Sequence, residues 1–145
     1  MEAKDLAVEA PRSPYETING FAILARTIDK CRAVINDTAG EYHFDCPLDK
    51  TLFGFKNINA EEFKAFVATG ASDEEIGKWV ETHGDTKTPD EVSKWSSAFK
   101  TDFSYSTDPN KKEWFQGECE RLALDPKTTT LFDYLDADDK VSFSA

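Results

Sequence analysis

The sequence has no apolar run long enough to cross a membrane. Its longest unbroken apolar run is FAILA at residues 21–25, whereas a membrane-spanning helix needs about 20 apolar residues. The N-terminus also lacks the combination of a basic start, an apolar stretch and a small-residue cleavage site that is typical of a secretory signal. We therefore expect a cytoplasmic protein.

Cysteine and histidine are scarce. The 145 residues include three cysteines and two histidines. The cysteines are odd in number, lie far apart and form no CxxC pair, which argues against a disulfide framework. We expect Cys31, Cys46 and Cys119 to be small buried hydrophobic groups. The chain also lacks a phosphate-binding P-loop, GxSxG, HExxH and a dinucleotide-binding fingerprint, so the sequence indicates no common catalytic class.

The sequence has fewer basic residues than acidic residues. Seventeen lysines and arginines face 28 aspartates and glutamates, which gives a net charge of −11. Proteins that bind nucleic acid or anionic membranes use a basic surface, because they must attract phosphate groups. We therefore expect no nucleic-acid and no membrane partner.

Signals of β-structure are sparse as well. No two adjacent runs alternate apolar and polar residues, as half-buried strands do. Eleven phenylalanines and three tryptophans supply apolar bulk for a core, and 145 residues fit one domain. The sequence predicts an all-α fold, a compact single domain of six or seven short helices around one long central N-terminal helix. Residues 1–13 are predicted as a flexible N-terminal lead-in and residues 14–145 as the helical domain.

The long helix is predicted to run from Ser13-Pro14 to the residues before Gly40. Apolar residues recur at steps of three and four, as on one face of a helix, at Ile18, Phe21, Leu24, Ile28, Cys31 and Ile35. Ile23 and Val34 lie off this stripe and give the helix a second apolar side. A helix that is apolar over more than half its girth is typically central in a fold.

Three shorter helices are indicated by capping patterns, in which a capping residue precedes a glutamate by three positions. These patterns are NAEE at 59–62, SDEE at 72–75 and TPDE at 88–91. Glycines suited to helix ends follow the first two, at Gly70 and Gly84. The patterns predict helices near 60–68, 73–82 and 89–100.

Two more helices are predicted in the last third of the chain. Asp108-Pro109 would start the first, with proline at its first position, and its core-facing stripe would be Trp114, Phe115, Cys119 and Leu122. The second is a short helix through Leu131, Phe132 and Leu135. The segment DDKVSF that follows is predicted as a brief strand or a tail. We expect the aspartates of DYLDADDK (133–140) to form a solvated acidic end.

Three segments resemble an uncharacterised bacterial family of small cytoplasmic proteins, one of the domain-of-unknown-function families. They are RSPYETINGFAILARTIDKCRA at 12–33, GEYHFDCPLDKTLFGF at 40–55 and ATGASDEEIGKWV at 68–80. Members share an RSP start, an I/L-D-K-x-R helix, a GEYH-type loop and a later helix that begins with S/T-D-E-E-I. The resemblance implies a bacterial origin and a single small domain, and it transfers no catalytic residue.

The loop GEYHFDCPLD at 40–49 gathers most of the side chains suited to chemistry. His43, Asp45, Cys46 and Asp49 include ligand types for a transition metal, but four ligands on one short loop seldom converge. We therefore expect no metal and no cofactor, with His43 and Asp45 as weak candidates for metal ligands. In the structural alternative, aromatic and leucine side chains hold the loop to the core, and Asp45 or Cys46 caps a helix whose first residue is Pro47.

Cys46 is the candidate nucleophile of the loop. It precedes a predicted helix N-terminus, which favours a thiolate, and His43 lies three residues away as a candidate base. The carboxylates of Glu41, Asp45 and Asp49 oppose a thiolate by like-charge repulsion.

Arg32 lies inside the apolar arc of the long helix, whereas Arg26 and Lys30 lie on the opposite side. Three interpretations remain open for it. The guanidinium can extend to solvent, or it can pair with a carboxylate of the following loop, which would be Glu41, Asp45 or Asp49. It can also point into a pocket that holds an anionic ligand.

We favour a non-catalytic binding or interaction domain, with a protein partner or a second copy of the chain as the partner. The alternative is a small-molecule-binding protein or an enzyme. Its site would lie between the first helix and the 40–49 loop, with Arg32, His43, Asp45 and Asp49 as ligand-binding candidates and His43 and Cys46 as catalytic candidates. That alternative expects Arg32 and His43 to meet in one pocket.

Overall fold

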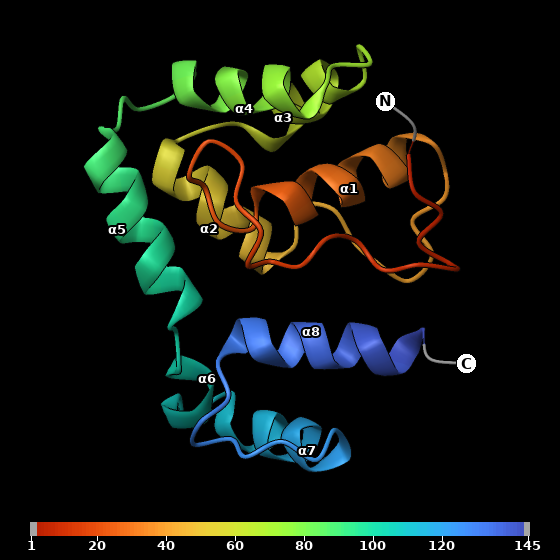
Figure 1. Cartoon of the computed structure of the whole chain (residues 1–145), viewed down its shortest axis with the longest axis vertical. Helices are drawn as coiled ribbons and strands as arrows, with labels where there is room; N and C mark the ends of the chain where they lie inside the picture. The colour runs from red at the N-terminus through yellow and green to blue at the C-terminus, as the bar shows by residue number, and fades with distance from the viewer. Residues whose placement is uncertain (1–2, 144–145) are drawn as a thin grey trace.

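A computed structural model describes residues 3–143, and this part of the chain is all-helical (Figure 1). The two residues before it and residues 144–145 lie outside the described residues. The described part contains eight helices: α1 (Leu24–Ile35), α2 (Pro47–Lys56), α3 (Ala60–Val67), α4 (Asp73–Thr82), α5 (Pro89–Lys100), α6 (Ser104–Thr107), α7 (Lys112–Arg121) and α8 (Leu131–Ser142). The all-α prediction is confirmed, and the count is one more than the largest number expected.

The long central helix is a wrong prediction. α1 has 12 residues, the same number as α5 and α8, and it begins at Leu24. The reason lies in Asn19-Gly20, which has positive φ at both residues (53° and 83°), as a two-residue type I′ turn requires. Ile18 and Phe21 pair across this turn as an isolated antiparallel bridge. The chain therefore reverses direction where the apolar stripe predicted a continuous helix.

The segment expected as a lead-in packs against α1 over its described residues. Leu6 is buried, and its amide donates to the carbonyl oxygen of Thr38, which follows α1. Arg12 donates from its backbone amide and from its guanidinium to Asp29 on α1. These contacts make the segment one wall of the site described below.

The three capping patterns predict α3, α4 and α5 to within one residue. Ser72 with Glu75 and Thr88 with Glu91 form reciprocal capping boxes. Asn59 accepts from the amides of Glu61 and Glu62 without the returning bond, so the first pattern gives a cap but not a box. These bonds satisfy amides at helix N-termini that have no partner within the helix.

The last two helices differ from their predictions. α7 begins at Lys112 rather than at Pro109, and Trp114 is 51% exposed instead of facing the core. α8 continues to Ser142, so the predicted strand or tail at DDKVSF is wrong over its described residues. Thr130 and Asp133 form a capping box at the start of α8, which fixes its first turn.

The helices form a stack along the long axis of the molecule, with α3 and α4 at one end and α7 at the other (Figure 1). The main apolar core surrounds α1 and includes Phe132 of α8. A second core joins Leu131 and Tyr134 of the same helix to Phe115 and Cys119 of α7. α8 therefore connects the two cores.

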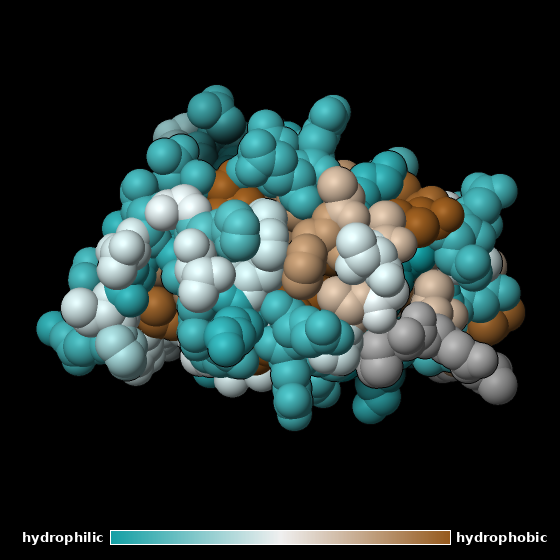
Figure 2. Space-filling view, turned by 90° about the horizontal axis from the view of Figure 1, so that it is seen from above, coloured by the Kyte–Doolittle hydropathy of each residue, from teal (hydrophilic) through white to brown (hydrophobic). Residues whose placement is uncertain are grey.

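Seen from the α3–α4 end, most of the surface is hydrophilic and the apolar residues are gathered in small areas (Figure 2). Within residues 3–143, no helix has both the length and the apolar character that crossing a membrane requires.

Gly84 follows α4 in a left-handed conformation, with φ at 67°. A Cβ atom there would overlap the carbonyl oxygen of Lys56. Gly70 also has a positive φ, 85°, but a Cβ atom there would meet no neighbour within 4 Å. We expect Gly70→Ala to lower the free energy of unfolding by about 1 kcal/mol and Gly84→Ala by about 3 kcal/mol. Urea unfolding of both variants measures the two losses, and their difference is the steric cost of placing a Cβ atom at position 84 against Lys56. Equal losses would contradict the close approach of Gly84 to Lys56.

Candidate functional site

α1 carries three buried cations, although Arg26 and Lys30 were expected on an outer face. Arg26 and Lys30 are each 4% exposed and Arg32 is 8% exposed. Each has a carboxylate partner: Arg26 pairs with Asp139 at 2.7 Å, Lys30 with Asp49 at 3.0 Å and Arg32 with Asp73 at 2.9 Å. Other segments of the chain therefore cover the charged sides of α1 as well as its apolar sides.

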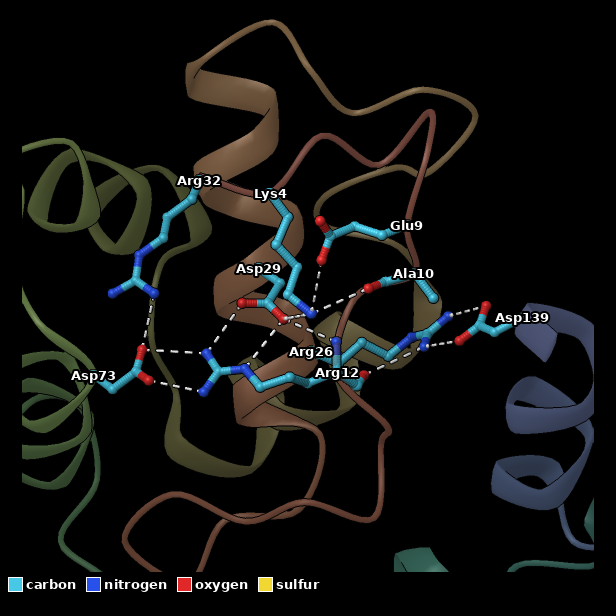
Figure 3. A network of polar contacts seen from close by, with 9 residues as sticks. All are labelled: Lys4, Glu9, Ala10, Arg12, Arg26, Asp29, Arg32, Asp73 and Asp139. Carbon is cyan, nitrogen blue, oxygen red and sulfur yellow. Dashed lines mark hydrogen bonds and ion pairs between the residues drawn. The ribbon is translucent and has the colours of Figure 1, made fainter. Parts of the chain in front are cut away.

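Arg32 forms an ion pair, but with a partner that the sequence analysis did not consider. It donates to Asp73 at the start of α4 and to the carbonyl oxygen of Ala71 at 3.0 Å. Figure 3 shows Arg12 reaching between Asp29 and Asp73, so that Asp73 is shared by two guanidiniums. The interpretations of a solvent-exposed head and of a pair with Glu41, Asp45 or Asp49 are both wrong.

Asp73 gives this network a pH dependence. Hydrogen bonds from Arg12 hold the pKa of Asp73 below its usual range, with the charges of Arg12 and Arg32 adding to the effect and partial burial opposing it. A carboxyl group whose pKa is lower in the folded protein stabilises the fold above its unfolded pKa of about 4. This contribution disappears as the pH falls through the folded value.

We therefore expect Asp73→Asn to reduce the free energy of unfolding at pH 7, and the deficit to shrink as the pH is lowered from 5 to 2. Urea unfolding of the variant and the wild type across this range measures the deficit. Asp90→Asn is the matched control, because Asp90 pairs with the exposed Lys94. A deficit that stays constant with pH would contradict the assignment.

The acidic end of the chain is not solvated as expected. Asp139 is 8% exposed and accepts from Arg26 and from the hydroxyl of Tyr42 at 2.6 Å. Asp136 accepts from Ser13 at 3.1 Å, and burial raises its pKa. α8 is thereby attached to α1, to the 40–46 loop and to the N-terminal segment.

Asp49 organises the start of α2. Its side chain is 0% exposed and accepts from the hydroxyl of Thr27 at 2.6 Å and from the amide of Asp45 at 2.9 Å. Cys46 is the N-cap residue and Pro47 the first helical residue, as the structural alternative predicted. Asp49 also accepts from the Cys46 amide, which completes a capping box. The carboxylate is therefore fully engaged within the protein and is not presented to a ligand.

Lys30 connects this carboxylate to the thiol of Cys46. Its ammonium donates to the Cys46 Sγ at 3.2 Å while pairing with Asp49. Cys46 is partly exposed, whereas Cys31 and Cys119 are buried. Burial raises the pKa of Cys31 to about 12, and it also raises the pKa of Cys119. Cys46 is thus the accessible one of three free thiols.

A pocket of about 640 Å³ opens beside Cys46. Its walls come from five segments, which are residues 6–7, α1, the 40–46 loop, the start of α2 at Leu48, and α8 with the residue after it. Its apolar lining includes Leu6, Leu48, Leu135 and Phe143, and its polar lining includes Arg26, Lys30, Tyr42, His43 and Cys46. We call this the α1–α8 pocket.

The structure brings some of the predicted site residues together and separates others. His43 is exposed and lines the α1–α8 pocket with Cys46. Arg32 lines a different depression with Ile35 and Asn36, so it does not meet His43. Asp45 pairs with the exposed Lys50 at 2.8 Å. Across residues 3–143, no three His, Cys, Asp or Glu side chains are grouped so as to hold a metal ion.

The sequence analysis missed Arg26 and Lys30 as lining residues of this pocket. A signal was present for Lys30, because Ile23, Thr27, Lys30 and Val34 follow one another at helical spacing on the second apolar side of α1. A lysine within an apolar row is a candidate for burial. Arg26 has no comparable local signal, since its partner Asp139 lies far away in the sequence.

Comparison with known families matches residues 8–141 to a domain of unknown function, DUF5069. The chain belongs to the DUF5069 family. The predicted membership of an uncharacterised domain family is thereby confirmed, and the match extends through α8 almost to its end. No curated protein matches the chain.

Proposed function

We propose that this DUF5069 protein binds a small molecule in the α1–α8 pocket. The observation that carries the proposal is one opening lined by apolar side chains and by the ammonium of Lys30, which touches the accessible thiol of Cys46. A volume of about 640 Å³ lies within the common range of small-molecule pockets, which combine mostly apolar walls with a few polar groups.

The lining favours a ligand with an apolar body and few charges. Leu6, Leu135 and Phe143 offer apolar contact. The two buried cations of the wall are already neutralised, Arg26 by Asp139 and Lys30 by Asp49. Lys30 has three donor hydrogens, of which Asp49 and Cys46 take two. Affinity would therefore come mainly from apolar burial, with a hydrogen-bond acceptor directed at Lys30.

The fluorescent dye 8-anilinonaphthalene-1-sulfonate, which has apolar rings and one sulfonate group, is a suitable probe. Ala7 lines the pocket, so Ala7→Trp places a large side chain in its mouth, whereas the adjacent Val8→Trp changes a residue that is not part of the lining. We expect saturable dye binding by the wild type and by Val8→Trp, with a loss of at least about tenfold in affinity for Ala7→Trp. Equal dye binding by the two variants would count against the pocket.

A second candidate function is thiol chemistry at Cys46, which the contact between Lys30 Nζ and Cys46 Sγ favours. The thiol lies at the N-terminus of α2 and on the wall of the same pocket. The thiol sulfur is therefore within reach of a molecule bound in the pocket. His43 lies on the same wall, as the base in such a reaction would.

Alkylation with iodoacetamide tests this candidate. In the native protein we expect Cys46 to be modified on the order of a hundredfold faster than Cys31 and Cys119, because the two buried thiols react only after local opening. Peptide mass spectrometry after timed quenching measures the three rates. Comparable rates for all three thiols would contradict the arrangement, and a urea-unfolded sample supplies the control in which the three are expected to converge.

A protein partner or a second copy of the chain remains the sequence-based proposal for an interaction. It is supported by the exposed apolar side chains of Phe103 and Trp114 near α6 and α7. Sedimentation of the wild type and of Trp114→Ser tests self-association through this surface. The net charge of −11 argues against nucleic acid and anionic membrane as partners, and we propose a bacterial, cytoplasmic setting for the protein.

A further inference from the structure

A second pocket, of about 600 Å³, lies on another part of the molecule. The turn at residues 17–21, the end of α2, the end of α4 and α5 surround it. Its lining contains three lysines, Lys56, Lys87 and Lys100, and one acidic residue, Glu81. This lining has a local excess of positive charge in a chain whose net charge is −11. We call it the lysine pocket.

The single carboxylate does not neutralise the lysines. Glu81 accepts a hydrogen bond from Asn19 at 2.9 Å. The ammonium of Lys87 lies 4.8 Å from the ring centroid of Phe55, which is a cation–π contact. Among the described residues, none of the three lysines has a carboxylate within 4.0 Å.

Lys56 is a buried lysine in the wall of this pocket. The residue is 1% exposed, and its ammonium donates to the backbone carbonyl oxygens of Glu81 and Asp85. Burial lowers its pKa. The charges of Asp85 and Glu81 favour the ammonium from beyond ion-pair distance. A buried ammonium without a contacting counter-ion is costly, because carbonyl dipoles replace only part of the lost hydration. An anion in the pocket would supply the missing negative charge.

Hydroxyl groups complete the polar lining. Ser93, Ser97 and Lys100 follow one another at helical spacing on α5 and face the same pocket. The side chains of Ser93 and Ser97 have no hydrogen-bond partner within the described part of the chain, whereas Ser96 is engaged by Gly20 and Ala22. Lysine and serine side chains that line one opening carry ammonium and hydroxyl donors, which are suited to the oxygens of a phosphate group.

We propose that the lysine pocket binds a small-molecule phosphate monoester, with Lys56, Lys87 and Lys100 around the phosphate. The volume exceeds the need of a free phosphate ion and leaves room for the organic part of the ligand. This proposal is independent of the α1–α8 pocket, because the two linings share no residue.

The test is a titration with glycerol 2-phosphate, inorganic phosphate and citrate by isothermal calorimetry at low ionic strength, where screening is weakest. The double variant Lys87→Gln/Lys100→Gln removes two pocket charges. Lys78→Gln/Lys112→Gln is the matched control, because it gives the same net charge and changes two exposed lysines outside the lining. We expect saturable binding of glycerol 2-phosphate by the wild type and by the control, and affinity at least about tenfold weaker for the pocket variant.

The variant Lys56→Met tests whether phosphate-ester binding can be lost without a loss of stability. Replacing a buried charge by an apolar side chain of similar length is expected to keep or raise the melting temperature, while phosphate-ester binding weakens at least tenfold. Absence of saturable binding to the wild type, equal losses in the pocket and control variants, or equal affinity for citrate would each overturn the proposal. The last result would identify the pocket as a carboxylate site instead.

Discussion

Replacement of Asp49 by alanine is expected to lower the free energy of unfolding by about 4 kcal/mol. The carboxylate accepts from Thr27, Lys30 and two amides at the start of α2. Alanine would leave the ammonium of Lys30 buried with only the thiol of Cys46 as a partner. It would also remove the reciprocal cap that fixes the first turn of α2, which holds Cys46 in place.

Asp45→Asn is the control for this variant, because it removes a nearby carboxylate that pairs with an exposed lysine. Asp45 has a positive φ of 62°, which asparagine tolerates. Exposed ion pairs are worth about 0.5 kcal/mol. Urea unfolding followed by circular dichroism gives both values. Losses of similar size for Asp49→Ala and Asp45→Asn would show that Lys30 does not depend on the buried carboxylate.

Asp139→Ala is expected to lower the free energy of unfolding by about 3 kcal/mol. The change would leave Arg26 buried without its carboxylate and the hydroxyl of Tyr42 without its acceptor. Asp138→Ala, one position earlier, is the control, because Asp138 pairs with the partly exposed Arg121. We expect a loss below about 1 kcal/mol for the control.

The origin of this loss can be separated with a double variant. Arg26→Met/Asp139→Leu removes both charges and fills their space with apolar groups, a change that is often neutral for buried pairs. We expect the double variant to recover at least half of the loss seen in Asp139→Ala. A double variant that is less stable than either single variant would instead indicate that the pair itself contributes most of the stability.

The sequence predicted those elements whose signals lie within a few residues. The boxes at Ser72 and Thr88 need only the four residues around each helix start, and the predicted bounds agree with α4 and α5. The start of α2 at Pro47 has the same local origin. A capping side chain and its amide partner are always close in sequence, so such signals do not depend on the rest of the fold.

The first helix was predicted too long because the prediction followed its apolar stripe and overlooked the turn pair Asn19-Gly20 within it. Its apolar stripe includes Ile18 and Phe21. Phe21 is buried and Ile18 is partly buried, and a turn rather than a helix places both against the core. Asn19-Gly20 is the residue pair most typical of a two-residue type I′ turn, and it lies in the middle of the stripe. The preference of Asn19-Gly20 for a turn therefore determines the backbone conformation here, although the apolar periodicity is that of a helix.

The ion pairs of Arg26 and Arg32 could not be predicted, because each carboxylate comes from a distant part of the chain. Arg26 is 113 positions from Asp139, and Arg32 is 41 from Asp73. Helical periodicity orders residues by their apolar character alone, so it placed Arg26 on an outer face and could not name the partner of Arg32. The motifs shared with the resembling family do contain several residues of these ion pairs, namely Arg12, Asp29, Lys30, Arg32 and Asp73.

The claim that the α1–α8 pocket binds a small apolar molecule is tested most directly by nuclear magnetic resonance with 8-anilinonaphthalene-1-sulfonate. Amide shifts in the ¹⁵N-labelled protein report which residues the dye contacts. The proposal predicts that the largest shifts belong to the lining, at Ala7, Lys30, His43, Cys46 and Phe143. Largest shifts around Phe103 and Trp114, with the lining unchanged, would contradict it.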